Sequence, residues 1–341
     1  MMTSKTVLLT GISGFIAKRI ALDLLNRGYS VVGSLRSLSR ADEVKKALKN
    51  KLTDPTVIEK QLRFVKLDLE LDEGWNEAMT GIASVIHTAS PFPIAQPKNE
   101  DELVRPAVQG TLRALRSAQR AGVTRVVLTS SIVAIMNKDK PEGAPLTEED
   151  WTDLSYPTVN AYDKSKTLAE KAAWDFVEKH PEMKLTTINP GLVAGTPMDE
   201  HYGSSLSVIE RFWVGKDPFV PNVGLPLVDI SDVSEMHITA LEKPEAVNQR
   251  YIAADRFVML PELAKILAKA YPNQKIPTKI APKFLLRLIA LFDAEVKAAL
   301  PRLNIEMATS SAKASRDLGI EFISAKESIL AAAASIAAVN K

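Results

Sequence analysis

A phenol and an ammonium group stand four residues apart in the run Tyr162-Asp163-Lys164-Ser165-Lys166, and a hydroxyl at Ser131 precedes them. If this run is helical, Tyr162 and Lys166 share one face. A tyrosine normally loses its proton near pH ~10, and a neighbouring positive charge lowers that pKa. Such a phenol can exchange a proton with a reacting oxygen near neutral pH, while Ser131 holds that oxygen. The same spacing also occurs in solvated surface pairs, so the surrounding elements decide between the two interpretations.

The composition bounds the kinds of site that the chain can build. Its 341 residues, 46% hydrophobic and 25% charged, allow one large domain or two unequal ones. The net charge of +2 gives no field that favours nucleic acid or an acidic membrane surface. Cysteine is absent, and the four histidines (His87, His180, His201 and His237) are widely spaced. We therefore expect no disulfide, no thiolate nucleophile and no metal site.

The N-terminal residues lead directly into a strand pattern and lack the layout of a signal peptide. Near the C-terminus, the apolar run 329–334 is far too short to span a bilayer. Together with the absence of cysteine, these features predict a cytoplasmic protein without a membrane segment.

The first predicted strand, residues 6–10, meets a glycine-containing turn and then a helix pattern that ends near Gly28. Gly11 permits a tight turn, Gly14 lets a pyrophosphate approach the backbone, and Ala17 lets the helix pack closely on the strand. The start of such a helix offers N–H groups and a positive dipole end to phosphates. A simple strand-to-helix connection remains the alternative, but the strand before and the helix after favour a dinucleotide site.

The second predicted strand, residues 29–35, ends where a dinucleotide fold places the adenosine ribose. An NAD enzyme needs an acidic residue there, and none occurs before Asp42. Arg36 can instead bind a 2′-phosphate, with Ser37 or Arg40 assisting. The sequence thus favours NADPH over NADH, although an arginine at a strand end can also be merely solvated.

Four more strands are predicted at 62–67, 84–91, 125–131 and 184–189, with helices at 101–121 and 161–179. This alternation indicates a parallel, doubly wound sheet. Ligands of such sheets bind outside the carboxyl ends of the strands, where Ser131 would lie. Asp68 can accept from an adenine amine or cap a turn, and His87 is more typical of a satisfied core histidine.

The motifs, taken in order, resemble the extended short-chain dehydrogenase/reductase family. The similarity is greatest to its branch of dihydroflavonol reductases, cinnamoyl-CoA reductases and yeast-type methylglyoxal or aldehyde reductases. It rests on Thr10-Gly11-x-x-Gly14-Phe15-Ile16-Ala17, Arg36, Asp68-Leu69, His87-Thr88-Ala89-Ser90-Pro91, Thr129-Ser130-Ser131, Ala161-Tyr162-x-x-Ser165-Lys166-x-x-Ala169-Glu170, Asn189-Pro190-Gly191-Leu192-Val193-x-Gly195 and Val228-Asp229-Ile230-x-Asp232-Val233. These pieces cover roughly residues 5–241. Ala17 replaces a glycine that is frequent in the wider family.

The resemblance implies an NADPH-dependent carbonyl reductase with a Rossmann-type sheet. Its catalytic residues would be Ser131, Tyr162 and Lys166, with Tyr162 as general acid. Lys166 would also bind the nicotinamide ribose, and its charge together with the oxidised ring would lower the pKa of Tyr162. The cofactor-binding residues would be Gly11, Ser13, Gly14, Phe15, Ile16, Arg36, Asp68, Leu69, Thr88, Ala89, Tyr162, Lys166, Pro190 and Leu192.

The resemblance also divides the chain. It assigns residues 1–192, with 227–254 returning, to an NADP-binding domain, and residues 193–226 and 255–341 to a smaller, mostly helical substrate domain. Apolar residues expected to face a small carbonyl substrate are Phe92, Ile132, Val133, Met198, Tyr202 and Phe219. The same scaffold also hosts sugar-nucleotide epimerases, 3β-hydroxysteroid dehydrogenases and dinucleotide-sensing binding proteins. The first two mostly use NAD, and sensors commonly lack the Tyr/Lys pair. We expect a monomer or a homodimer.

Overall fold

The computed structural model describes residues 5–91, 99–141, 143–215 and 217–339. Its strands are β1 (Thr6–Thr10), β2 (Ser30–Leu35), β3 (Leu62–Lys66), β4 (Ser84–His87), β5 (Arg125–Thr129), β6 (Lys184–Pro190), β7 (Leu192–Ala194), β8 (Gly224–Asp229), β9 (Gln249–Ala253) and β10 (Arg256–Met259). Its helices are α1 (Phe15–Asn26), α2 (Ala41–Lys49), α3 (Val57–Gln61), α4 (Trp75–Ala78), α5 (Asp101–Arg120), α6 (Ala161–Lys179), α7 (Gly203–Trp213), α8 (Ile230–Glu242), α9 (Leu260–Ala270), α10 (Lys283–Ile289), α11 (Ala294–Ala299) and α12 (Ala325–Val339).

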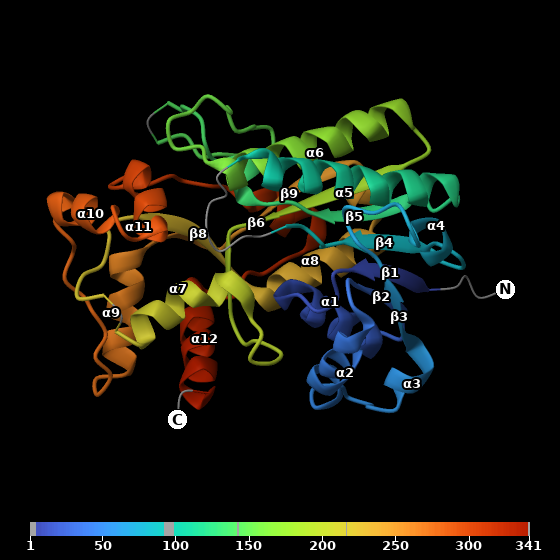
Figure 1. Cartoon of the computed structure of the whole chain (residues 1–341), viewed down its shortest axis with the longest axis horizontal. Coiled ribbons are helices and arrows are strands. Elements are labelled where there is room, and N and C mark those ends of the chain that lie inside the picture. Colours follow the sequence, from blue (N-terminus) through green and yellow to red (C-terminus); the bar gives the residue numbers. More distant parts are fainter. Residues whose placement is uncertain (1–4, 92–98, 142, 216, 340–341) are drawn as a thin grey trace.

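Seven parallel strands form the main sheet in the order β3-β2-β1-β4-β5-β6-β9. The chain builds outward from β1 in one direction and then outward from β4 in the other (Figure 1). The strand order therefore reverses between β1 and β4, which is where ligands of such sheets bind. The predicted doubly wound, Rossmann-type fold is confirmed.

Alternate residues of the central strands feed two separate cores. In β1, Val7 and Leu9 pack on the side of α1, α2 and α8, whereas Leu8 packs on the side of α4, α5 and α6. β4 divides likewise, with Ile86 in the first core and Val85 in the second. Because both faces are covered, these strands are nearly continuous apolar runs, which is the signal that predicted them.

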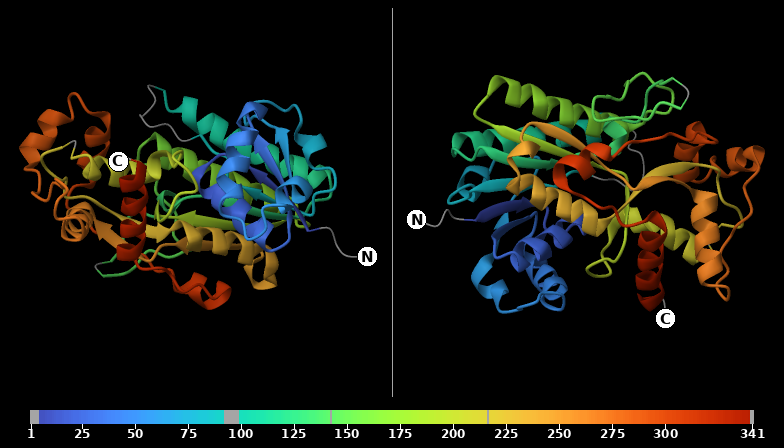
Figure 2. Two further views of the ribbon diagram at one scale, coloured as in Figure 1. Left: turned by 90° about the horizontal axis from the view of Figure 1, so that it is seen from below. Right: turned by 180° about the vertical axis from the view of Figure 1, so that it is seen from behind.

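Helices α7 and α9 to α12 and a second, three-stranded sheet gather at the end of the molecule away from β1 to β3 (Figure 2). This sheet has the order β10-β8-β7, and its core also contains α7, α9 and α12. Val228 and Asp229 were expected in the main sheet, but they lie in β8 of the second sheet because β8 pairs with β7 and β10. α8 and β9 do return to the main sheet. None of the helices in the described ranges has the length and apolarity needed to cross a membrane.

The start of α6 is fixed by its cap and by a distant arginine. Asn160 accepts from the backbone N–H groups of Tyr162 and Asp163, and the Asp163 carboxylate accepts from the Asn160 N–H, which completes a capping box. Asp163 is fully buried and forms an ion pair of 2.5 Å with Arg302. Burial raises the pKa of Asp163, and the Arg302 charge opposes this rise. The cap thus sets where the predicted catalytic helix begins.

Replacement of Arg302 should destabilise the protein, because it leaves the buried Asp163 carboxylate unpaired. Arg302→Met leaves the Asp163 carboxylate without its cationic partner, so the free energy of unfolding should fall by about 3–5 kcal/mol at pH 7. Urea unfolding measures this loss. Adding Asp163→Asn should recover most of it, while Arg316→Met, at an exposed pair with Asp317, should change little. A loss that persists in the double variant would contradict the ion-pair explanation.

Two buried neutral histidines should make the fold sensitive to mild acid. Burial lowers the pKa of His87 to about 3 and that of His237 to about 4, whereas both have ordinary values in the unfolded chain. Below pH ~6.5 both histidines therefore bind protons in the unfolded state but not in the native state. The free energy of unfolding then falls as pH falls, by about 1.4 kcal/mol for each histidine and pH unit.

Urea unfolding between pH 7 and 5 measures this slope. His237→Gln should remove about half of the histidine contribution. His201→Gln, at an exposed position, should leave the slope unchanged. A stability that is flat over this interval in the unaltered protein would contradict the expectation.

Candidate active site

The predicted site residues converge on the edge of the main sheet where its parallel strands end. Gly11 to Ile16 follow β1, Arg36 follows β2, Asp68 and Leu69 follow β3, and Thr88 and Ala89 follow β4. Ser131 follows β5, while Pro190 ends β6 and Leu192 lies in β7. Helix α6 carries Tyr162 and Lys166. The Tyr162 side chain is hydrogen-bonded to that of Ser131, so the start of this helix lies at the same edge. The predicted clustering at this edge is therefore present.

Ser131 and Tyr162 form the centre of the cluster. Ser131 stands in extended conformation between β5 and a 3-10 turn, Ile132–Ala134, and its hydroxyl accepts from the Val133 N–H at 3.4 Å. The Tyr162 hydroxyl hydrogen-bonds to the Ser131 side chain. Two hydroxyls that share a hydrogen bond can both be directed at one oxygen atom of a bound molecule.

The pKa of Tyr162 differs from the expectation. Burial raises it to about 12, and the hydrogen bond with Ser131 opposes the rise only in part. We expected the Lys166 charge to lower this pKa, but in the protein alone the loss of water around the phenol is the larger effect. The phenol is therefore protonated at neutral pH and stands ready as a proton donor.

Lys166 lies one helical turn after Tyr162 and is also buried. Burial lowers its pKa to about 8, and the carboxylate of Glu170, one further turn along α6, raises it. The balance leaves an ammonium group that is mostly protonated near pH 7 but close to its titration range. Such a group can attract electron-rich oxygens.

The β1–α1 turn has the features of a phosphate cradle. Gly11 adopts φ +68°, and a side chain there would approach Ala89 to 3.1 Å. Gly14 is the N-cap of α1, where no side chain caps the helix and no acidic residue occupies the first turn. The first N–H groups of α1 are thus available to an anion. Ser13, Phe15 and Ile16 flank this helix start, and Ala17 is buried in the core.

The ends of β1 and β4 are tied together beside the cradle. The hydroxyl of Thr10 accepts from the N–H groups of Thr88 and Ala89, each at 3.1 Å, and hydrogen-bonds to His87 at 2.9 Å. The Thr88 hydroxyl donates to the Thr10 carbonyl at 2.5 Å. His87 is buried, and its Nδ1 is bound to Thr10, but its Nε2 has no hydrogen-bond partner among the described residues. It is therefore a core histidine, as expected, but only one of its ring nitrogens is satisfied.

Two arginines after β2 differ in their surroundings. Arg36 is exposed and has no hydrogen bond or ion pair with any residue in the described ranges. Arg40 is bound to Glu43 at 2.9 Å and to the Ser13 hydroxyl at 3.1 Å. Arg36 is therefore the cation that can receive an anionic group without first leaving a partner, and Arg40 lies next to the cradle through Ser13.

The two residues after β3 have structural contacts. The Asp68 carboxylate accepts from the Glu70 N–H at 2.9 Å, so it caps a turn, which was one of its two predicted roles. Leu69 packs closely against Gly110 of α5. After β6, Gly191 lies so near the Pro226 carbonyl that a side chain there would approach it to 2.2 Å, and this contact fixes the chain between Pro190 and Leu192.

The residues predicted to face a substrate are divided between several places. Ile132 and Val133 belong to a small cluster against which Tyr162, Leu225 and Met307 pack. Met198 lies in the core shared with α1 and α8, and Tyr202 lies in the core of the second sheet with its hydroxyl donated to Glu210. Phe219 is partly buried, and Phe92 lies outside the described residues. Ile132 and Val133 are thus the members of the set that belong to the cluster on which Tyr162 packs.

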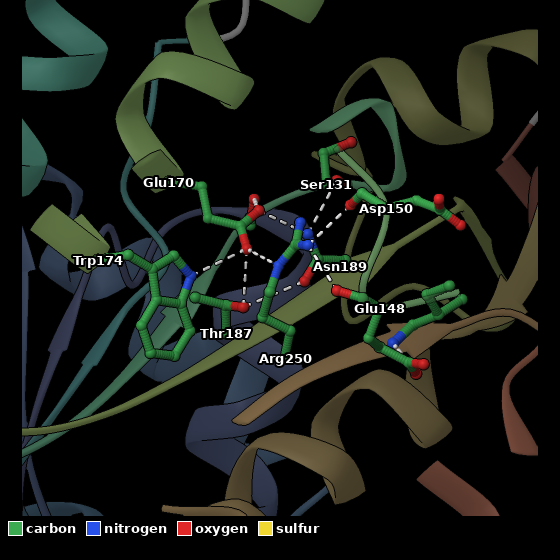
Figure 3. Close-up of polar contacts among 10 residues, drawn as sticks. Ser131, Glu148, Asp150, Glu170, Trp174, Thr187, Asn189 and Arg250 are labelled. Carbon is green, nitrogen blue, oxygen red and sulfur yellow. Dashed lines mark hydrogen bonds and ion pairs between the residues drawn. The ribbon is translucent and has the colours of Figure 1, made fainter. Parts of the chain in front are cut away.

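Sequence reasoning missed the polar network beneath this site. Glu170 appeared in the motif around Tyr162, but no role followed from it. In the structure it is buried and joined to Arg250 of β9 at 2.7 Å (Figure 3). Lys18 is similarly buried, with ion pairs to Asp199 and Glu43. The signal available was the presence of charged residues inside apolar segments, but their partners are too distant in sequence to identify.

Comparison with known proteins agrees with the site. The model of the NAD dependent epimerase/dehydratase family matches residues 7–254. Cinnamoyl-CoA reductase 1 of Arabidopsis thaliana is 33% identical over 328 residues, which cover 95% of this chain and 87% of that protein. An anthocyanidin reductase of Vitis vinifera is 31% identical over 290 residues, which cover 80% of this chain and 83% of the relative.

A solved structure extends the match through the C-terminal part. The yeast methylglyoxal/isovaleraldehyde reductase Gre2, crystallised with NADPH, has a TM-score of 0.81 and 27% identity. The alignment covers 98% of this chain and 99% of that one. The chain therefore belongs to the NAD dependent epimerase/dehydratase family, the extended short-chain dehydrogenases/reductases that its motifs predicted.

Proposed function

We propose that this protein reduces an aldehyde or ketone to an alcohol with NADPH. The observation that carries the proposal is the hydrogen bond between the Tyr162 and Ser131 hydroxyls, one helical turn from the buried Lys166. Membership of a family of NAD(P)-dependent enzymes supports it, as do relatives that are themselves named reductases. An epimerase or hydroxysteroid dehydrogenase and a binding protein without turnover are the competing functions, and the experiments below separate them.

The residues around the cradle fit a phosphorylated dinucleotide. The uncapped start of α1 and the absence of acidic residues in its first turn suit a pyrophosphate. Arg36, exposed and without an ionic partner in the described ranges, suits a 2′-phosphate, which distinguishes NADPH from NADH. The residues proposed to border the nicotinamide half of the cofactor lie at or just after the ends of β4 and β6, farther along the sheet than the cradle. They are Thr88, Ala89, Pro190 and Leu192.

Each side chain of the central cluster has a proposed role. The cofactor supplies a hydride to the carbonyl carbon when bound. Tyr162 donates its proton to the carbonyl oxygen, so that hydride and proton together give the alcohol. Ser131 donates a hydrogen bond to the same oxygen and fixes its position. Lys166, as an ammonium group, stabilises the phenolate that Tyr162 becomes.

The surroundings of Tyr162 also bear on the substrate class. Tyr162 packs on an apolar cluster that contains Ile132 and Val133, and Leu225 and Met307 pack on the same cluster. We therefore expect a substrate whose carbonyl carries at least one apolar substituent.

A carbonyl panel tests the function directly. Purified protein is mixed with NADPH, and then with NADH, against small aldehydes, α-diketones, β-ketoesters, aryl ketones and a dihydroflavonol. Turnover with NADPH and much less with NADH supports the proposal. Turnover of a sugar nucleotide or a 3β-hydroxysteroid with NAD would replace it with the competing enzyme class. Tight NADPH binding with no turnover would favour the binding protein.

Loss of the Tyr162 hydroxyl should remove the proton donor while leaving the fold intact. General acid catalysis contributes about 10²–10⁴ in rate, so Tyr162→Phe should lower kcat by at least ~100-fold. NADPH affinity, measured by fluorescence titration, should stay close to that of the unaltered protein. Tyr156→Phe, at a half-buried tyrosine whose hydroxyl is bound to Asp139, is the matched control and should keep full turnover. Near-normal kcat in Tyr162→Phe would refute the assigned role.

Loss of the Arg36 guanidinium should reduce the preference for NADPH. A charge-assisted hydrogen bond to a 2′-phosphate is lost in Arg36→Ala, so the Kd for NADPH should rise roughly 10- to 100-fold. The Kd for NADH should change little, because NADH lacks that phosphate. Equal weakening of both cofactors, or of neither, would remove Arg36 from the 2′-phosphate site.

A further inference from the structure

A carboxylate is buried directly beneath the proposed catalytic groups. Glu170 lies on α6 one helical turn after Lys166, and its side chain has no solvent exposure. An unpaired charge in such a place costs several kcal/mol, so its surroundings must compensate it. Figure 3 shows how side chains from separate elements point toward this carboxylate.

The two oxygens of Glu170 accept hydrogen bonds from five side chains. Oε1 accepts from Arg250 at 2.7 Å, Thr187 at 2.9 Å and Trp174 at 3.3 Å. Oε2 accepts from Ser130 at 2.5 Å and from Asn189 at 2.7 Å. All five are donors, and an ionised carboxylate is the form that can accept from all of them. The site therefore holds a fixed negative charge.

One of these donors connects Glu170 to the backbone of Ser131. The side-chain amide of Asn189 donates both to Glu170 and to the Ser131 carbonyl, at 2.7 and 3.1 Å. Ser130, the residue before, is held by Glu170 through its hydroxyl and by the Ile188 carbonyl through its N–H. The position of the Ser131 peptide thus depends on the Glu170 carboxylate, to which it is linked by two hydrogen bonds through Asn189.

The same charge acts on Lys166. Burial lowers the pKa of this lysine, and the Glu170 carboxylate raises it. Besides Tyr162, one helical turn before Lys166, other charged and titratable groups among the described residues lie near the pair. His87 of β4 is neutral and feels the Lys166 charge, Arg250 of β9 is bound to Glu170, and Asp163 one turn earlier is paired with Arg302.

Arg250 is held in place independently of Glu170. Its guanidinium donates to the carbonyls of Glu148 and Asp150 at 2.6 and 2.8 Å. It also stacks on the ring of Trp151, 3.7 Å from the ring centroid. Arg250 therefore neutralises part of the Glu170 charge from a fixed position. The part of the charge that is not neutralised attracts the Lys166 ammonium group.

We propose that Glu170 is a positioning residue for the reduction, which fixes the Ser131 peptide through Asn189 and acts as the counter-charge that keeps Lys166 an ammonium group, with Arg250 limiting its strength. This inference rests on the function proposed above. It predicts more than a structural ion pair would, because removal of Glu170 or of Arg250 must shift the titration of Lys166 in opposite directions.

The test is the pH profile of turnover and of NADPH binding. We assign the alkaline limb of kcat to Lys166, because burial lowers the pKa of Lys166 to about 8 and raises that of Tyr162 to about 12. In Glu170→Gln the limb should move to lower pH by roughly one unit, because the stabilising charge is gone. In Arg250→Met it should move to higher pH, because the Glu170 charge is no longer neutralised. The pH dependence of the NADPH Kd should shift in the same directions, because Lys166 is proposed to bind the nicotinamide ribose.

Controls separate this role from a loss of stability. Trp174→Phe removes one donor to Glu170 and no charge, so it should lower the melting temperature slightly and leave the limb in place. If Glu170→Gln does not fold, Glu170→Asp keeps the charge but withdraws it by one methylene, and a smaller downward shift is expected.

One contrary outcome is that the Glu170 and Arg250 variants melt at lower temperatures while the alkaline limb stays in place. That outcome would contradict the proposal and show that Glu170 has only a structural role. A shift of the alkaline limb in the same direction in Glu170→Gln and in Arg250→Met would also overturn the proposal. Full turnover in Tyr162→Phe, by contrast, would overturn the proposed function. The NADPH-binding profile would still report on Glu170 in that case, so the two failures are distinguishable.

Discussion

The buried negative charge of Glu170 is the constraint on which the geometry of the site depends. Its donors come from four elements, since Ser130 follows β5, Thr187 and Asn189 lie in β6, Arg250 lies in β9 and Trp174 lies in α6 itself. A slip of α6 against the sheet would separate the carboxylate from these donors and leave a charge in the interior. The interaction therefore selects one register for the helix, and Tyr162 and Lys166 are carried on that helix.

The second constraint is the competition between burial and charge at the phenol. A cation nearby lowers a tyrosine pKa, and burial raises it. In this protein burial is the larger effect, and the pKa of Tyr162 reaches about 12. A protonated phenol suits the reductive direction, in which the carbonyl oxygen needs a proton. In the proposed reaction, alcohol oxidation would need the phenolate, which is scarce at neutral pH in the protein alone.

Local patterns in the sequence predicted most of the fold. The strands of the Rossmann-type sheet are short apolar runs, and the predicted range of α6 matches its observed bounds, which the capping box of Asn160 and Asp163 explains. The pairs Glu170–Arg250 and Asp163–Arg302 could not be predicted in this way, because their partners are 80 and 139 residues apart. A charge in an amphipathic helix has the same local signature whether it is solvated or buried, and only the topology decides which. The second sheet was missed for the same reason, since β7 and β10 are short and their pairing with β8 is not local.

Cofactor selection illustrates how an unpaired charge differs from a paired one. Arg40 and Arg36 stand four residues apart, yet Arg40 is bound to Glu43 and Ser13 whereas Arg36 is bound to no residue in the described ranges. A phosphate that binds Arg40 must share it with a carboxylate of the same sign, so much of the attraction is cancelled. A phosphate that binds Arg36 meets no such competition and displaces only water. The selectivity of the site is therefore expected to reside in Arg36, while Arg40 and Glu43 hold the turn that presents it.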